Sequence, residues 1–257
     1  MIRKIFSTLT ISAALILLVS PASVLGQASE SAEPFKVGTF AVDDMPFVGL
    51  VMRDDNLIVD VADANRAMEL MPAYSSINVP DDMLGFIEQY EYGLKYRVYE
   101  VVNWLVEEEL LDGGSRPDYV HSTSDVDILA PIQYPSKVMN AAVNFYTHAC
   151  EGCSAQELEA RTRQRQEDRG VPYLFLKPTR GAIIGDGEDV VMPWGRDRIE
   201  YEVEMAIVFG KTGKYVSATR AYDHVFGYMV AMDISDRGGR PPGGYGVASD
   251  WFVGKGH

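Results

Sequence analysis

Glycine and proline punctuate the second half of the chain and limit its strands to short ones. Glycine weakens a strand interior and proline cannot donate to the ladder, so regular strands end near both residues. A polar helical segment at 154–169 interrupts these runs, with Ser154 as its predicted N-cap. Strand-like runs lie at 136–145, 173–178, 181–185, 189–193, 203–210 and 226–235. The pattern predicts a mostly-β body with inserted helices.

The first half predicts a smaller unit without evident chemistry. Residues 35–61 alternate and turn like a small antiparallel unit. Two helical patterns follow, the first with Asp63 as its predicted cap and the second interrupted near Gly93. We therefore predict an α+β fold with a small N-terminal α+β domain at 34–125 and a larger domain at 129–257.

Composition excludes some partners. The chain has 257 residues, of which 47% are hydrophobic and 23% are charged, as in globular proteins with a core. Its formal net charge is −14. Nucleic acids and anionic membrane surfaces attract Lys and Arg, so neither is an expected partner.

The N-terminus has the pattern of a secretory signal peptide, which we place at residues 1–26. A basic start, Met1-Ile-Arg-Lys, precedes an apolar run at 9–19 and then small residues. The apolar run is shorter than a comfortable membrane span, so an uncleaved anchor is the less favoured alternative. We expect export to a bacterial periplasm, no membrane contact after cleavage, and a mature chain that begins near Gln27.

Cys150 and Cys153 form a single C-x-x-C pair. Haem attachment requires a histidine directly after the pair, and this sequence has none there. No second pair completes a four-thiolate zinc site. Export favours a local disulfide. A structural pair is therefore favoured over a redox motif.

An acidic alternation precedes an apolar run. Glu200, Glu202 and Glu204 occupy alternate positions, and the residues at 205–209 are typical of a buried strand. Alternate side chains of a strand share a face, where like charges repel. A hard divalent cation such as Mg²⁺, Mn²⁺ or Ca²⁺ relieves that repulsion, and Asp233, after another apolar run, offers a further oxygen donor. The alternative is a solvated strand edge.

His148 and Glu151 lie three positions apart. That spacing puts both on one face of a helix, where a carboxylate can orient the imidazole as a general base. The alternative is a surface histidine that happens to lie near a glutamate.

Five segments in order resemble the fumarylacetoacetate hydrolase family. The resemblance covers about Leu129 to His257, and the residues at 35–64 resemble the small N-terminal domain of bacterial members. It implies a mixed β-roll fold and a divalent metal, usually Mg²⁺ or Mn²⁺. The segments are LAPIQYPSKVMNAAVNFYTHACE, YLFLKPTRGAIIG, IEYEVEMAIVFGK, VFGYMVAMDISDR and DWFVGKGH.

By position, the resemblance implies that the metal ligands are Glu202, Glu204 and Asp233. Glu200 matches a place where the family usually has aspartate, and it is not a ligand there. The residue-based reasoning and the resemblance thus share three ligands, and only the resemblance excludes Glu200.

The resemblance also implies the residues around the metal. A catalytic dyad falls on His148 and Glu151. Lys177, Arg237 and Lys255 match positions that line the substrate pocket, the two lysines with catalytic roles. Without the motifs, both lysines would be interpreted as surface residues.

Several residues depart from the family pattern. Phe145 stands where tyrosine is common, Met232 replaces the usual asparagine, and Asp236 and Gly238 replace a small residue and an acid. The family domain also continues beyond the segment that ends here at His257, so we expect a truncated catalytic domain.

The resemblance implies a metal-dependent hydrolase that cleaves a carbon–carbon bond in a small 2-oxo or 1,3-dioxo acid, of the fumarylacetoacetate or acylpyruvate type. His148 would activate water, and the cation with a lysine would stabilise the enolate that leaves. Decarboxylase, isomerase or hydratase reactions at the same site are alternatives. An exported, non-catalytic protein that binds a metal or small acid is an alternative of another class. A homodimer is expected from the resemblance alone.

Overall fold

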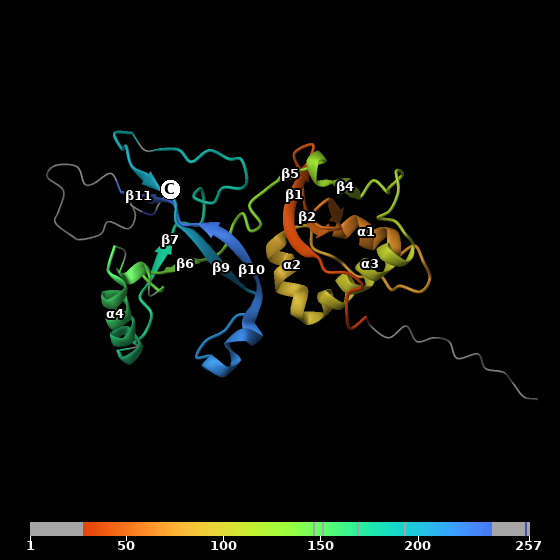
Figure 1. Cartoon of the computed structure of the whole chain (residues 1–257). Helices are drawn as coiled ribbons and strands as arrows, with labels where there is room; N and C mark the ends of the chain where they lie inside the picture. The colour runs from red at the N-terminus through yellow and green to blue at the C-terminus, as the bar shows by residue number, and fades with distance from the viewer. Residues whose placement is uncertain are drawn as a thin grey trace, which may run out of the picture.

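The computed structural model shows two parts side by side, an N-terminal sheet with helices and a second part of short β ladders (Figure 1). It describes residues 28–145, 147–150, 152–168, 170–192, 194–237 and 255. The predicted signal peptide at 1–26, Glu151 and Gly238 lie outside the described residues.

The first part is built on a five-stranded antiparallel sheet with the order β4-β3-β2-β1-β5. Its strands are β1 (Lys36–Val42), β2 (Met45–Met52), β3 (Leu57–Asp60), β4 (Val120–Ser122) and β5 (Asp127–Ile128). Tight turns join the first three strands, and their residues include Asp43, Asp44 and Asp54 at positive φ. Asp tolerates this conformation better than most residues, so the predicted antiparallel unit forms as expected.

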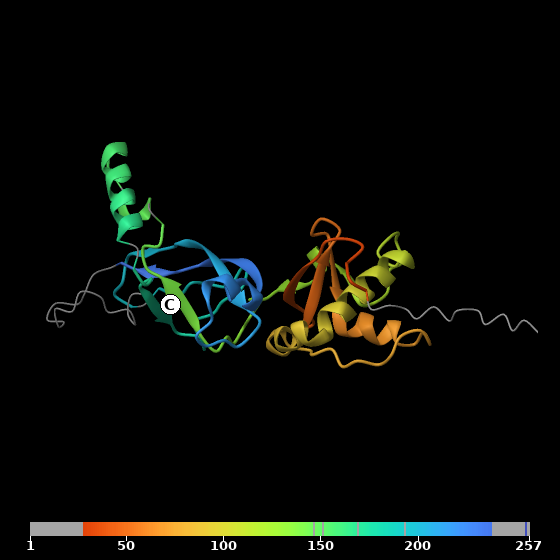
Figure 2. The ribbon, with the colours of Figure 1, turned by 90° about the horizontal axis from the view of Figure 1, so that it is seen from below.

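Three α-helices lie on one face of this sheet (Figures 1 and 2). They are α1 (Val61–Met68), α2 (Met83–Gln89) and α3 (Lys95–Glu107), with a π-helical turn, η1 (Tyr90–Leu94), between the last two. The predicted cap at Asp63 was wrong. Asp60 caps α1 by accepting from the backbone N–H groups of Ala62 and Asp63, because the helix begins directly at the end of β3. The predicted interruption at Gly93 is confirmed by its φ of 121°.

The main hydrophobic core lies between the sheet and these helices. Fully buried side chains from both layers fill it, including Leu50, Val59, Phe86, Val101 and Leu105. Val208 and Phe226 of the second part also pack against this core. The two parts are therefore joined by apolar contact.

In its described residues, the second part consists of three two-stranded antiparallel ladders (Figure 2). They pair β6 (Val138–Ala141) with β7 (Leu174–Lys177), β8 (Ile199–Glu200) with β11 (Ser235–Asp236), and β9 (Val203–Phe209) with β10 (Val225–Met232). The predicted α+β class is confirmed. The runs at 181–185 and 189–192 form no strand, so that part of the prediction was wrong.

The connection between β6 and β7 carries a short 3-10 turn, η3 (His148–Cys150), and the helix α4 (Ala155–Glu167). Ser154 caps α4, as the sequence predicted, and the structure adds a reciprocal capping box with Glu157. No residue of α4 is buried, and the helix projects from the second part (Figure 2).

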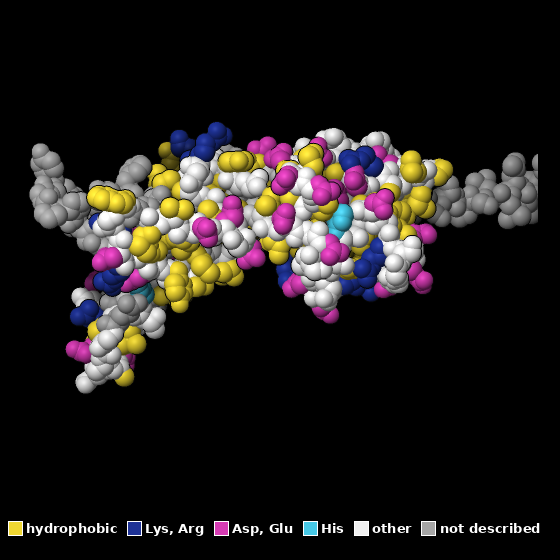
Figure 3. Space-filling model, turned by 90° about the horizontal axis from the view of Figure 1, so that it is seen from above, with side chains coloured by type: hydrophobic (Ala, Val, Ile, Leu, Met, Phe, Trp, Pro, Cys, Tyr) yellow, Lys and Arg dark blue, Asp and Glu magenta, His cyan; other side chains and the backbone are white. Residues whose placement is uncertain are grey.

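The sequence predicted a buried strand at 205–209, but the structure leaves one face of this strand exposed. Exposure alternates along β9, with Met205 at 65% and Phe209 at 58%. Hydrophobic side chains are also visible on the surface of the second part in Figure 3. The prediction failed because apolar residues continue on both faces of this strand, while only one face packs against the rest of the described chain. Among the described helices, none is long and apolar enough to cross a membrane.

Candidate metal centre

The β9–β10 ladder brings three carboxylates together. Glu202 and Glu204 lie two positions apart and share a strand face. The backbone N–H of Asp233 donates to the carbonyl of Glu202 at 2.8 Å, which extends the ladder and places Asp233 opposite Glu202. Glu204 pairs across the ladder with Ala231, whose small side chain leaves space on this face. One oxygen from each of the three carboxylates lies within 4.8 Å of the others.

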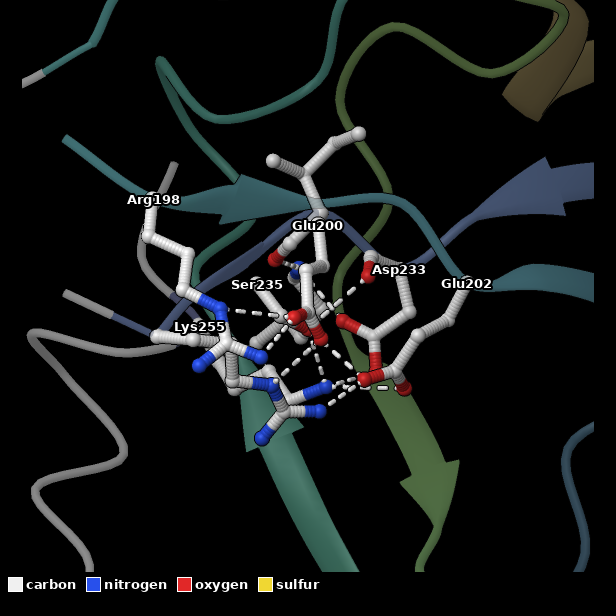
Figure 4. Close-up of polar contacts among 9 residues, drawn as sticks. Arg198, Glu200, Glu202, Asp233, Ser235 and Lys255 are labelled. Atoms are coloured by element: carbon white, nitrogen blue, oxygen red, sulfur yellow. Dashed lines mark hydrogen bonds and ion pairs between the residues drawn. The ribbon is translucent and has the colours of Figure 1, made fainter. Parts of the chain in front are cut away.

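Glu200 does not join this cluster. It lies on β8, which pairs with β11 instead of continuing the β9–β10 ladder. Its carboxylate accepts from Arg198, and it forms an ion pair with Arg237 at 3.4 Å (Figure 4). The hydrogen bond from Arg198 is the main cause that lowers the pKa of Glu200. The expectation that all three glutamates share one face was therefore wrong, and the exclusion of Glu200 agrees with the structure.

Two lysines bind the carboxylate cluster from inside the protein. Lys177, at the end of β7, donates to Oδ1 of Asp233 at 2.7 Å and to the carbonyl of Ile234 at 2.9 Å. Lys255 donates to Oε2 of Glu202 at 3.0 Å and to Oδ2 of Asp233 at 2.8 Å (Figure 4). The two lysine side chains are only 9% and 5% exposed. The motif-independent interpretation of both as surface residues was wrong, because lysine is rarely buried without a paired acid.

Ser235 and Arg237 complete the contacts to Glu202. Ser235 is fully buried, and its hydroxyl lies 3.0 Å from Oε1 of Glu202 and 2.5 Å from Nζ of Lys255. The guanidinium of Arg237 pairs with Oε1 of the same glutamate. The position of Glu202 is thus fixed by three neighbouring side chains.

The pKa values of two of the carboxylates shift in opposite directions. Burial raises the pKa of Asp233, but hydrogen bonds and charge from Lys177 and Lys255 outweigh burial, so its pKa is lowered. Burial raises the pKa of Glu204, and the charges of Asp233 and Glu202 raise it further. Glu204 therefore resists ionisation, whereas Asp233 is held in its ionised form.

A cavity of about 530 Å³ opens onto the cluster. Its lining includes the three carboxylates, Arg237, Lys255 and His148, together with the aromatic side chains of Phe145, Phe175 and Tyr201. His148 is exposed and is the first residue of η3. Its electrostatic interaction with Glu204 is a smaller cause, which lowers the pKa of that glutamate. The predicted general base and the predicted ligands thus line the same cavity.

The orientation of His148 by Glu151 stays a prediction, since Glu151 lies outside the described residues. The segment of His148 is a 3-10 turn instead of the expected α-helical turn. A disulfide between Cys150 and Cys153 follows directly, in agreement with the local disulfide favoured from the sequence.

Sequence reasoning missed several residues that shape the site. Ser235 gave no signal, because a serine beside an acid is common in any loop. Asp236 appeared only as a departure from the family pattern, yet its buried carboxylate pairs with Arg196 instead of lining the cavity. Arg237 pairs with Glu202, so the buried Asp236 needs a different cation. A search for that cation could have found Arg196.

The donor set fits a hard divalent cation. Three carboxylates supply oxygen ligands within reach of one ion, and the cavity leaves room for water or substrate oxygens. Cysteine and histidine, which favour zinc or copper, are absent from this group of described residues. The predicted ligands Glu202, Glu204 and Asp233 are therefore those that could hold a metal.

The residues of this site lie in a segment that matches a known protein family. Residues 137–257 match the model of the fumarylacetoacetate (FAA) hydrolase C-terminal domain. This part of the chain belongs to the fumarylacetoacetate hydrolase family. The match contains the three carboxylates, His148, both lysines and Arg237, so the resemblance stated from the motifs is confirmed.

Individual relatives show what the chain is similar to. The human mitochondrial oxaloacetate tautomerase FAHD2B is 35% identical over 114 residues, which cover 44% of this chain and 32% of the relative. An uncharacterized protein of Pyrococcus horikoshii is 35% identical over 103 residues, covering 40% of this chain and 39% of the relative. The chain thus spans about a third of the length of the curated relatives it matches.

Among solved structures, maleylpyruvate hydrolase from Sphingobium sp. SYK-6 aligns with a TM-score of 0.50 and 24% identity. The alignment covers 78% of this chain and 60% of that one. At this identity the similarity establishes the fold of the chain.

Proposed function

We propose that this protein is a metal-dependent enzyme that cleaves a carbon–carbon bond in a small 2-oxo or 1,3-dioxo acid. The observation that carries the proposal is the meeting of three carboxylates with His148 in one cavity. Family membership and the similarity to a relative called oxaloacetate tautomerase support the substrate class.

Glu202, Glu204 and Asp233 would hold the cation, for which Mg²⁺ or Mn²⁺ is proposed and Ca²⁺ is an alternative. When bound, such an ion supplies Lewis-acid chemistry and binds the oxygens of an oxo acid. Because the ligands come from the end of a paired ladder, their spacing is set by backbone hydrogen bonds before any ion arrives.

The remaining side chains of the cavity have separate roles in the proposal. His148 stands at an exposed position on the wall, where its imidazole can take a proton from water. Arg237 offers a positive charge to a substrate carboxylate from the same wall. Phe145 and Phe175 line the cavity with apolar surface, which suits the carbon skeleton of a small organic acid.

A direct test combines metal and substrate. The full chain, freed of metal with EDTA, is assayed with acylpyruvates, oxaloacetate and unsaturated oxo-diacids, before and after Mg²⁺ or Mn²⁺ is added. We expect turnover only with metal, and loss of that turnover in Glu202→Ala. Full activity in EDTA would contradict the proposal.

Tautomerisation is the second candidate, favoured by the 35% identity over 114 residues to human oxaloacetate tautomerase FAHD2B. It moves a proton between the carbon next to the oxo group and the oxo oxygen and breaks no carbon–carbon bond, and His148 could serve as the base for that transfer. Proton NMR in D₂O separates the two reactions, because a tautomerase exchanges hydrogen next to the oxo group while the carbon skeleton stays intact. Decarboxylation, hydration and other isomerisations are read in the same spectra.

Export is part of the proposal, with residues 1–26 as the signal peptide. The Cys150–Cys153 disulfide supports it, since disulfides persist in oxidising compartments such as the periplasm. A homodimer is also proposed, and its mass in solution tests it. Metal binding without turnover on any of these acids would favour the alternative of a non-catalytic binding protein.

A further inference from the structure

The ammonium of Lys255 is fully engaged by the carboxylate cluster. Its three hydrogen-bond partners are Oε2 of Glu202 at 3.0 Å, Oδ2 of Asp233 at 2.8 Å and Oγ of Ser235 at 2.5 Å. The ring of Phe175 lies 5.4 Å from the same nitrogen. An ammonium carries three donors, so all of them are used on these acceptors.

Lys255 bridges two of the three residues that would hold a cation. Its partners are one oxygen of Glu202 and one of Asp233, so its positive charge lies between two of the predicted ligands. Lys177 differs, because it reaches only Asp233 in the cluster and also donates to a backbone carbonyl, at 2.9 Å. The bridging position belongs to Lys255.

The cluster is already balanced in charge. Three carboxylates face three cations, Lys177, Lys255 and Arg237, which contact Glu202 or Asp233. A divalent ion adds two positive charges to this balanced set. At short range in a partly buried site such charges repel strongly, so the nearest ammonium has to give way.

We propose that Lys255 is an internal counter-ion that holds the carboxylates together without metal and that a divalent cation displaces. This inference rests on the metal site of the proposed function. It assigns the lysine two positions, one bridging Glu202 and Asp233 and one turned toward the cavity that it also lines. Metal loading would then deliver a positive charge to the place where substrate binds.

The first experiment measures Mn²⁺ affinity at one fixed pH by electron paramagnetic resonance, with the full chain freed of metal. Lys255→Gln removes the competing charge and keeps a side chain that can donate hydrogen bonds. Lys36→Gln is the matched control, because Lys36 is 68% exposed and pairs with Asp55 in the first part. We expect Lys255→Gln to bind Mn²⁺ at least about tenfold more tightly than wild type, and the control to match wild type.

Thermal unfolding of the same proteins gives a second readout. In EDTA, Lys255→Gln should unfold at a lower temperature than wild type, because repulsion among the carboxylates is uncompensated. Saturating Mn²⁺ should raise the unfolding temperature of the variant more than that of wild type. A purely structural lysine would lower stability without this selective rescue.

The outcomes separate this inference from the proposed function. Equal or weaker Mn²⁺ binding by Lys255→Gln overturns the counter-ion role while leaving the metal site intact. Absence of Mn²⁺ binding in wild type and variant alike overturns both. Tighter binding with selective rescue supports both.

A third measurement needs no variant at the site. Acetylation of lysines in the wild type is followed by mass spectrometry, with the exposed Lys36 as the internal reference. Lys255 should react slowly without metal and faster with Mn²⁺, because displacement frees its ammonium. Unchanged protection of Lys255 at saturating Mn²⁺ would overturn the proposed exchange even where Lys255→Gln fails to fold.

Discussion

Asp233 lies directly across the ladder from Glu202, with its backbone N–H donating to the glutamate carbonyl at 2.8 Å. This bond joins residues 31 positions apart in the sequence and brings two candidate ligands onto the same strand face. It lies beyond the last ladder pair of β9 and β10, Val203 with Met232. The candidate metal centre therefore lies where the strands stop pairing and the cavity begins.

Glu204→Gln should weaken metal binding and remove part of its pH dependence. The substitution deletes one anionic ligand, so we expect at least about a tenfold loss of Mn²⁺ affinity at pH 7. A carboxylate binds a cation only when ionised, and burial raises the pKa of Glu204 above its ordinary value of 4.5. Affinity of the wild type should thus be retained above that raised pKa and fall as the pH drops through it.

Binding isotherms from pH 7 downward check this prediction. The pH at which affinity begins to fall should be lower in Glu204→Gln than in wild type. Glu188→Gln is a suitable control, because Glu188 is exposed and is not one of the three clustered carboxylates. Parallel pH profiles for wild type and Glu204→Gln would contradict the prediction.

Asp233 should stabilise the metal-free protein above acidic pH. The pKa of Asp233 is lowered in the folded protein, so its contribution is present above the unfolded pKa of about 3.9 and is lost as the pH falls through the folded pKa. Asp233→Asn leaves Lys177 and Lys255 without this anion. We expect a loss of about 3 kcal/mol in the free energy of unfolding at pH 7.

Urea unfolding in EDTA at several pH values measures this loss. The difference between wild type and Asp233→Asn should shrink as the pH falls toward and below the lowered pKa. A difference that stays constant down to pH 2 would show that the carboxylate charge is not its source.

Phe226→Ala should loosen the attachment of the ladder to the first part. The ring of Phe226 lies 5.0 Å from that of Tyr90 and 6.4 Å from that of Phe86, both in edge-to-face contact. Because Phe226 is only partly buried, we expect a cost of about 2 kcal/mol, below that of a fully buried phenylalanine. Phe209→Ala, at a 58% exposed position on the same ladder, should cost less than about 1 kcal/mol.

Chemical denaturation of both variants tests the contact. If Phe209→Ala destabilises the protein as much as Phe226→Ala, the aromatic contact between the two parts is not the source of the lost stability.

Replacing Cys150 and Cys153 together with serine should leave metal affinity unchanged. The disulfide closes a short turn beside His148, and neither sulfur belongs to the carboxylate cluster. Because this disulfide closes so short a loop, its loss should lower the free energy of unfolding by at most about 2 kcal/mol. Turnover on any accepted substrate should also be retained. Its abolition in a folded double variant would indicate that the mechanism uses thiol chemistry.

The sequence alone determined features that depend on neighbours along the chain. Alternation placed Glu202 and Glu204 on one strand face, and Ser154 capped α4, because strand periodicity and capping are local. The apolar run before Asp233 marked this acid as a further oxygen donor, and only the ordered motifs excluded Glu200.

Tertiary structure decided the rest. A break between β8 and β9 places Glu200 against Arg198, and the pairing of β9 with β10 brings Asp233 within reach of Glu202 and Glu204. Only folding buries Lys177 and Lys255 against Asp233, since each ammonium comes from a distant segment and is held by a charge that sequence spacing does not reveal. Local periodicity fixes which face a side chain takes, and long-range pairing fixes what it meets there.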